Sequence, residues 1–245
     1  MARSAPDGYT LLMIHQGTAA INPHVYAKPG YDALRDFAPI TRFGHGNLLL
    51  TVPTEVSATS VAELIRMGKS KPGALNYGTP GVGTPPHLAS EMFIRMAGID
   101  AVHIPYKGGG ALMTALLGGQ LTWSMDGLTA QLPHVKSGRL RALAVTGACR
   151  SGALPEVPTL AEAGVPGYEF EGWTGIASPA GTPAAVIARL HAEIVRINDT
   201  SEAREWFAAS GADPGLLSPE VFSQFIRVEH DKLGKVIREA GIKAE

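Results

Sequence analysis

The sequence has one cysteine, almost no net charge and no long hydrophobic run. Cys149 is the only thiol among 245 residues, so the chain can form no internal disulfide and no cysteine-based metal cluster. The 21 basic and 22 acidic side chains give a net charge of -1, which leaves no basic excess for nucleic acid or an anionic membrane. No apolar run approaches the roughly 20 residues of a membrane helix. Any anion site must therefore be local.

The usual sequence signatures of catalysis are also missing. The chain has no GxSxG elbow, no HExxH and no P-loop, and its eight histidines are scattered and not set at metal-ligand spacing. Cys149 falls in a predicted turn beside Arg150, and a nearby cation can lower a thiol pKa, but such a cysteine is more often inert. We predict no catalytic residue, no metal ligand and no cofactor. An enzyme acting on a small carboxylate is the less favoured alternative.

Glycine, in contrast, is abundant, with 29 residues, and it concentrates in a stretch from 75 to 121. Residues 75–77 predict a buried strand, and the glycine-rich loop 78–83 follows it. Thr84 is a candidate N-cap for a helix whose first turn holds two prolines. A helix start with exposed N–H donors favours a carboxylate, phosphate or sulfate.

The same order of strand, glycine loop and helix start occurs a second time. Residues 101–104 predict a strand, three glycines follow at 108–110, and an apolar helix is expected over 111–117. Glycine loops join strands to helices in any α/β domain, so either loop alone is explained by turn chemistry. The pair together favours a binding site in which two helix starts face one ligand.

Three polar side chains fall where a ligand contact is plausible. Thr18 follows the predicted buried strand 9–14, at the strand end where open α/β sheets bind ligands. His87, in the first helical turn, either donates to a ligand oxygen or only caps the helix. Asp126 ends the predicted strand 123–126, where it accepts from a ligand amine or from nearby backbone. The alternatives stay open at this point.

The remaining elements follow from capping residues and hydrophobic periodicity. Strands are expected at 48–52, 140–146 and 173–177. Helices are expected at 61–71 after Ser60 and at 158–164 with Thr159 and Glu162 as a capping box. A helix after Thr182 is expected to have a core face of Val186, Ile187, Leu190, Ile194 and Ile197. The last helix, after Ser218, is expected to bury Phe222, Phe225, Ile226, Leu233, Val236 and Ile237. Glu91 and Arg95 are expected to pair on the surface of their helix.

The order of motifs resembles a known family. TPGVGTPPHLASEMF, IPYKGGG, LLGGQL and VPTLAEAG, together with PDGYTLL, DFAPIT and VIREAGI, are similar to the tripartite tricarboxylate transporter solute receptors, also called the Bug family. The resemblance implies an α/β, two-lobed fold of the type II periplasmic-binding-protein kind, each lobe a mostly parallel sheet flanked by helices. It places residues 1–46 and 171–245 in lobe one and residues 47–170 in lobe two.

The resemblance also implies a function. We expect a monomeric periplasmic receptor that binds a small carboxylate between its lobes and delivers it to a membrane permease; a receptor that signals to a partner protein is the alternative. Family members ordinarily carry an export signal and further N-terminal residues, so we expect lobe one to be incomplete here. The expected ligand contacts are Thr18, Gly81, Val82, Gly83, Thr84, His87, Lys107, Gly108, Gly109 and Asp126.

Overall fold

The computed structural model describes residues 2–243, and the chain divides into two compact units. Unit 1 comprises Met1–His45 and Gly172–Glu245, and unit 2 comprises Gly46–Glu171. The strands that carry the chain from one unit to the other are β2 (Phe37–Pro53) and β7 (Glu171–Pro179). That the two units act as lobes around a ligand stays a prediction.

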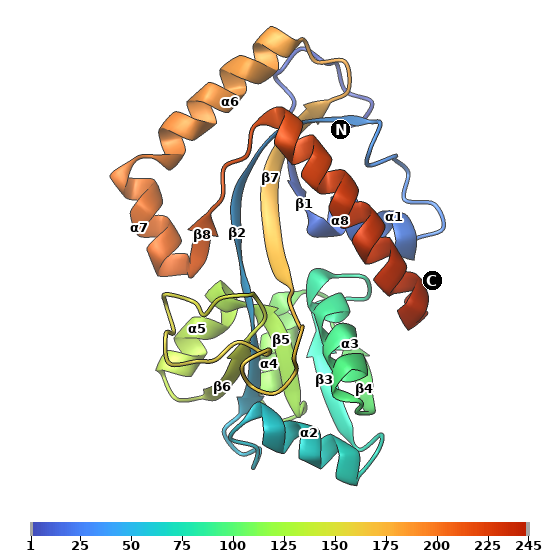
Figure 1. The fold of residues 1–245 in the computed structure, drawn as a ribbon, viewed down its shortest axis with the longest axis vertical. Helices are drawn as coiled ribbons and strands as arrows, with labels where there is room; N and C mark the ends of the chain where they lie inside the picture. Colours follow the sequence, from blue (N-terminus) through green and yellow to red (C-terminus); the bar gives the residue numbers. More distant parts are fainter. Residues whose placement is uncertain (1, 244–245) are drawn as a thin grey trace. The chain divides into compact units, whose positions relative to one another are not determined.

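Unit 1 combines a small sheet with five helical segments (Figure 1). Strand β1 pairs antiparallel with β7, with Ile14 opposite Gly175, β7 lies next to β2, and β8 pairs with β2. Besides β2 and β7, its elements are β1 (Leu12–His15), the π-helical turn η1 (Gly17–Ile21), α1 (Asn22–Val25), α6 (Ala184–Asn198), α7 (Ser201–Ser210), β8 (Ala212–Pro214) and α8 (Pro219–Ala240).

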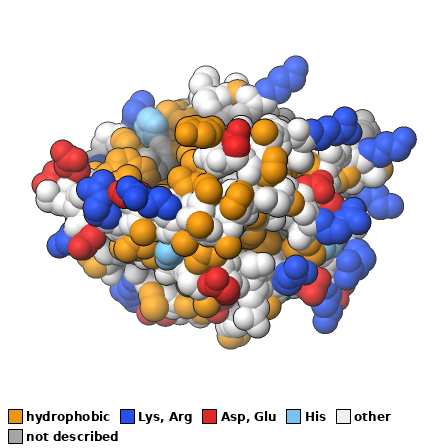
Figure 2. All heavy atoms as spheres, turned by 90° about the horizontal axis from the view of Figure 1, so that it is seen from above, with side chains coloured by type: hydrophobic (Ala, Val, Ile, Leu, Met, Phe, Trp, Pro, Cys, Tyr) orange, Lys and Arg blue, Asp and Glu red, His pale blue; other side chains and the backbone are white. Residues whose placement is uncertain are grey.

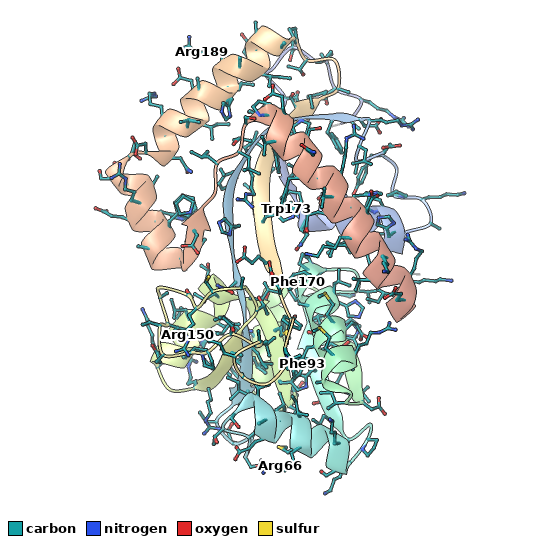
Figure 3. All side chains as sticks on the ribbon, in the orientation of Figure 1. Arg66, Phe93, Arg150, Phe170, Trp173 and Arg189 are labelled. Carbon is teal, nitrogen blue, oxygen red and sulfur yellow. The ribbon has the colours of Figure 1, made fainter. Side chains whose placement is uncertain are left out.

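Helix α8 contributes Phe222 and Ile226 to the core of unit 1. Leu233 and Ile237 are also buried as the sequence predicts, whereas Phe225 and Val236 are only partly buried. The helix begins after Ser218, whose hydroxyl oxygen accepts from the Val221 N–H at 3.3 Å. Trp173 of β7, labelled in Figure 3, meets the rings of Phe222 and Phe225 edge-on, with centroids 5.6 and 5.4 Å away. Edge-to-face aromatic pairs of this kind add to the burial of apolar area, so the sheet and α8 are held together by aromatic packing.

Strand β1 differs from its prediction. A buried strand over 9–14 was expected, but β1 begins at Leu12, and of the predicted residues only Ile14 is fully buried. The side chain of Tyr9 is 94% exposed and that of Met13 62% exposed. β1 pairs with β7 alone within the described sheet, and its successive side chains point to opposite faces, so Ile14 lies on a covered face and Met13 on an exposed one.

Helix α6 corrects a second prediction, because its apolar face is not core. No residue of α6 is fully buried, and Ile197 is 55% exposed. Its N-cap is Pro183, while the Thr182 hydroxyl donates to the Pro179 carbonyl at 2.8 Å. An open apolar hollow of about 370 Å³ lies beside the helix, lined in part by Phe43, Ile194, Ile197, Trp206 and Phe207.

Other hydrophobic side chains are also exposed on the surface of the protein. Figure 2 shows hydrophobic side chains over the middle of the face it draws, with Lys and Arg side chains mainly toward the edges. Single exposed apolar residues are ordinary on protein surfaces, so the face by itself indicates no partner.

Unit 2 is a sheet with helices, and its strands run in the spatial order β2-β5-β3-β4, with β6 also paired to β2. Strand β3 runs parallel to β4 and β5, and β2 runs antiparallel to β5 and β6. The carboxyl ends of the three parallel strands therefore meet at one edge. The elements are α2 (Val61–Ser70), β3 (Leu75–Thr79), α3 (Pro85–Ala97), β4 (Ala101–Pro105), α4 (Gly109–Leu117), β5 (Trp123–Gly127), α5 (Leu128–Lys136) and β6 (Leu140–Val145).

In unit 2 the predicted capping box at Thr159 and Glu162 forms, but the predicted helix over 158–164 does not. Thr159 and Glu162 exchange the two bonds of a capping box, at 2.8 and 3.1 Å, but residues 158–164 form turns and no regular helix. Helix α5 was not predicted, because Pro133 lies inside it and proline normally interrupts a helix. The capping bonds thus form without the helix that usually accompanies them.

Candidate functional site

The two glycine loops lie side by side at the carboxyl edge of the unit 2 sheet. β3 and β4 are parallel neighbours, with Thr79 opposite Pro105. Past the strand ends, the Tyr106 N–H donates to the Thr79 carbonyl at 2.9 Å, and the Gly108 N–H donates to the Pro80 carbonyl at 3.0 Å. The structure therefore brings the starts of α3 and α4 together.

The amides of the first loop divide into occupied and available donors. The Gly83 N–H donates to Nδ1 of His87 at 3.1 Å, and the Gly81 N–H lies 3.4 Å from the Thr79 hydroxyl oxygen. Among residues 2–243, the N–H groups of Val82 and Thr84 are shown with no protein acceptor. These two amides are the ones that a ligand oxygen can use, whereas the predicted contact through Gly83 is already engaged within the protein.

Thr84 is the N-cap of α3 by position but does not cap it with its side chain. Its hydroxyl donates instead to the Gly81 carbonyl at 2.8 Å, which closes the loop on itself. Pro85 and Pro86 then occupy the first helical positions and have no N–H to offer. Gly83 has a φ of 72°, a left-handed conformation that favours glycine. The loop is thus fixed by bonds to its own backbone.

At the second loop, the start of the helix is exposed and has no side-chain cap. Gly108 has a φ of 96° and is the N-cap of α4, which runs for nine residues. Gly109 and Gly110 are exposed, and no side chain caps the helix. First-turn amides and the helix dipole attract anions. Lys107 is exposed just before this start and adds a positive charge.

Asp126 reaches the same edge from the end of β5. Its Oδ1 accepts from the Gly127 N–H at 2.8 Å, and its Oδ2 lies 3.8 Å from the place a Cβ on Gly109 would take. Burial raises the pKa of the Asp126 carboxyl, while the Gly127 bond acts in the opposite direction. One carboxyl oxygen is thus engaged with backbone and the other faces the start of α4.

His87 is not a surface residue. It is 6% exposed, and its ring stacks on that of His103 with centroids 4.0 Å apart. The Nε2 atom of His87 lies 3.9 Å from a carboxylate oxygen of Glu91, and Glu91 also accepts from the Tyr77 hydroxyl. Glu91 therefore faces inward, which corrects its predicted surface pair with Arg95.

Thr18 belongs to unit 1, in the π-helical turn after β1. Its hydroxyl lies 3.2 Å from Nε2 of His15, and its carbonyl accepts from the Tyr31 hydroxyl at 2.8 Å. Its role as a ligand contact stays a prediction.

Sequence reasoning missed the polar and aromatic residues beneath the first loop. Tyr77 faces His103 on β4 and Trp123 on β5 in the strand register, and Thr79 lies two residues further along β3. The Thr79 hydroxyl oxygen is 2.7 Å from Nε2 of His103. Only the register of three strands brings these residues together, and the sequence does not state that register.

Within the described residues, no group of three or more His, Cys, Asp or Glu side chains is arranged to hold a metal ion. No helix among them is both long and apolar enough to cross a membrane. Cys149 is exposed, and its neighbour Arg150 pairs with Glu162 at 2.9 Å.

The two α/β units have the fold of periplasmic binding proteins, as the similarity to the solved periplasmic binding protein BugD shows. The sequence model for the tripartite tricarboxylate transporter family receptor matches residues 1–242. The chain belongs to this family, so the resemblance seen in the sequence is confirmed.

Individual relatives agree with this assignment. Protein BugT of Bordetella pertussis is 34% identical over 243 residues, covering 99% of this chain and 74% of BugT. A solved R. palustris protein with adipate is 35% identical, with a TM-score of 0.93 over 99% of this chain and 81% of that one. MatC from Rhodopseudomonas palustris, with bound malate, is 28% identical, with a TM-score of 0.86 over 96% of this chain and 81% of MatC.

Proposed function

We propose that this protein is an extracytoplasmic solute receptor, located in the periplasm, that binds a small organic carboxylate and delivers it to a membrane permease of the tripartite tricarboxylate type. The observation that carries the proposal is the pair of adjacent glycine loops. Among residues 2–243 no protein acceptor is shown for the Val82 and Thr84 amides, and no side chain caps the start of α4. The related structures with adipate and malate support a carboxylate as the ligand class.

The chemistry of the loops suits binding and release better than turnover. Backbone N–H groups hold a carboxylate through charge-assisted hydrogen bonds without donating or removing a proton. Asp126, whose second oxygen faces Gly109, adds an acceptor for a hydroxyl or ammonium group of the ligand. No step of acid, base or nucleophile chemistry is assigned to these residues.

A thermal-shift panel tests the carboxylate. Adipate, malate, citrate, benzoate and glutamate are each added to the protein, with adipamide as the uncharged analogue of adipate. A ligand at about 100 times its dissociation constant stabilises the folded protein by about 2.7 kcal/mol, so at least one acid should raise the melting temperature clearly. Adipamide should not. Equal shifts with adipate and adipamide, or no shift with any acid, would contradict carboxylate recognition.

A further inference from the structure

Below the first glycine loop, four rings form a continuous stack. Trp123 lies on Tyr77 with centroids 4.7 Å apart, Tyr77 on His103 at 4.9 Å, and His103 on His87 at 4.0 Å, with interplanar angles of 16°, 19° and 13°. The four residues come from β5, β3, β4 and α3. The stack connects the core of the sheet to the first turn of α3.

The upper end of this stack is bonded to the loop at two points. The Gly83 N–H donates to Nδ1 of His87, and the Thr79 hydroxyl links Nε2 of His103, at 2.7 Å, to the Gly81 carbonyl, at 3.1 Å. Residues 81 and 83 are thereby fixed on either side of Val82. Of the two amides shown with no protein acceptor among residues 2–243, that of Val82 lies between these fixed residues and that of Thr84 directly follows Gly83.

The bond to Gly83 also defines the protonation state of the ring. A nitrogen that accepts from an N–H carries no hydrogen, so His87 is neutral with its hydrogen on Nε2, the atom that faces Glu91 at 3.9 Å. Burial lowers the pKa of His87 to about 4. The neutral ring is therefore the form present near neutral pH.

We propose that His87 is a positioning residue for the carboxylate site: its unprotonated Nδ1 holds Gly83 and so keeps the loop in the conformation that leaves the Val82 and Thr84 amides available. This role rests on the proposed function for its effect on affinity. It does not require His87 to touch the ligand, which distinguishes it from the direct contact expected from the sequence.

The groups that face His87 determine how the bond between His87 and Gly83 responds to pH. They are Glu91 of the same helix, His103 of β4, and Tyr77 of β3 through its bond to Glu91. Burial also lowers the pKa of His103 to about 4, with the charge of His87 acting in the same direction and Glu91 opposing it. If Nδ1 of His87 were protonated, its N–H would face the Gly83 N–H. Two donors cannot form a hydrogen bond, so the bond between Gly83 and His87 is lost in acid.

The sign of the stability effect follows from the lowered pKa. A histidine with a folded-state pKa near 4 and an unfolded value of 6.5 binds fewer protons when folded. Its contribution to stability is fully present above pH 6.5 and is lost as the pH falls from 6.5 toward 4. His103 titrates in the same window, so a variant must separate the two rings.

Two substitutions at one position make that separation. In His87→Asn the amide oxygen can take the place of Nδ1 as an acceptor that does not titrate, and in His87→Phe the ring remains but the acceptor is gone. We expect adipate and malate to bind His87→Asn within about threefold of the unaltered protein, and His87→Phe to bind about tenfold more weakly or worse. Relative to His87→Asn, the unaltered protein should lose stability between pH 6.5 and 4.

Tyr77→Phe is the matched control, because it removes the hydrogen bond to Glu91 from the same stack without touching the loop. It should lower the melting temperature and leave affinity within about threefold. If Tyr77→Phe weakened binding as much as His87→Phe, the effect would be a general loss of packing and the positioning role would be overturned. The same holds if His87→Asn binds as weakly as His87→Phe.

Amide exchange measured by NMR without ligand separates this inference from the proposed function. The Gly83 amide should exchange slowly in the unaltered protein and in His87→Asn, and about tenfold faster or more in His87→Phe. If none of the acids binds the unaltered protein, carboxylate recognition fails while the exchange rates still decide whether His87 holds the loop. Equal Gly83 exchange in all three proteins overturns the inference, and if His87→Phe does not fold, fast exchange in His87→Asn overturns it.

Discussion

At the scale of single residues, the loop between β3 and α3 is defined by which amides are already used. Gly81 and Gly83 donate to side chains of Thr79 and His87, and the two prolines that open α3 have no donor. The amides available to a ligand are those that do not already donate within the protein. A glycine-rich sequence at a helix start indicates many free amides, but here the protein itself takes up two of them.

The Thr84 amide can be tested by removing only its hydrogen. Thr84 has a φ of -80° and an extended ψ of 158°, which proline tolerates, so Thr84→Pro deletes the N–H. Thr84→Val keeps the N–H and deletes the hydroxyl that donates to the Gly81 carbonyl. Losing a hydrogen bond to a charged group costs about 1.5–3 kcal/mol, so Thr84→Pro should weaken carboxylate binding by tenfold or more in a calorimetric titration.

The valine variant is the control for the loop itself. It should lose some stability, because one loop bond is gone, and retain most of its affinity. Circular dichroism should show both variants folded. If Thr84→Pro bound adipate as tightly as Thr84→Val, the Thr84 amide would not belong to the site.

The sequence predicted where most of the candidate site residues lie, but it did not predict that His87 is buried. The positions 81–84, 108–109 and 126 follow from strand ends and glycines, which are local signals, and the structure brings them to one edge of unit 2. The inward orientation of the His87 ring depends instead on stacking against His103, which lies on β4. Local sequence does not carry that information, because it requires the register of β3 against β4.

At the scale of elements, α6 and α8 show why hydrophobic periodicity predicts a helix better than its burial. Both helices repeat apolar residues at helical spacing, yet α8 buries Phe222, Ile226, Leu233 and Ile237 and no residue of α6 is fully buried. Periodicity says that one face is apolar. It does not say how much of that face another element covers.

A matched pair of isoleucines measures this difference. Ile226 of α8 is 2% exposed and Ile197 of α6 is 55% exposed. Ile226→Ala removes fully packed methyl groups and should cost about 2–5 kcal/mol, while Ile197→Ala should cost less than about 1 kcal/mol. Urea unfolding of the two variants gives the comparison. Equal losses would show that the end of α6 is covered in solution.

At the scale of the whole molecule, the family follows from the sequence more firmly than the site does. Motifs spread from PDGYTLL to VIREAGI predict the family, and the family model matches residues 1–242. The element types follow largely from glycines, prolines and caps, whereas α5 and α7 were not predicted. The burial of β1 and α6 was predicted wrongly, because burial depends on neighbours distant in sequence.

The whole-molecule charge leads to a last prediction, on how fast a ligand associates. The net charge is only -1, so the molecule as a whole does not attract an anion from a distance. The proposed site instead relies on amides and on the dipoles of α3 and α4, whose effect falls off within about a turn of the helix. Salt screens long-range attraction, with a Debye length of about 10 Å at 0.1 M. The association rate of a dicarboxylate should therefore depend little on salt.

Stopped-flow measurements with adipate, following intrinsic tryptophan fluorescence, test this expectation. Between about 0.05 and 0.5 M sodium chloride, the association rate constant should change by less than about threefold, because there is little steering to screen. Lys107→Ala should lower it only slightly, since that side chain is exposed and is a single charge. A rate that fell tenfold or more over the same range would show that a concentrated positive field guides the ligand, and the amide loops would then not be the main source of attraction.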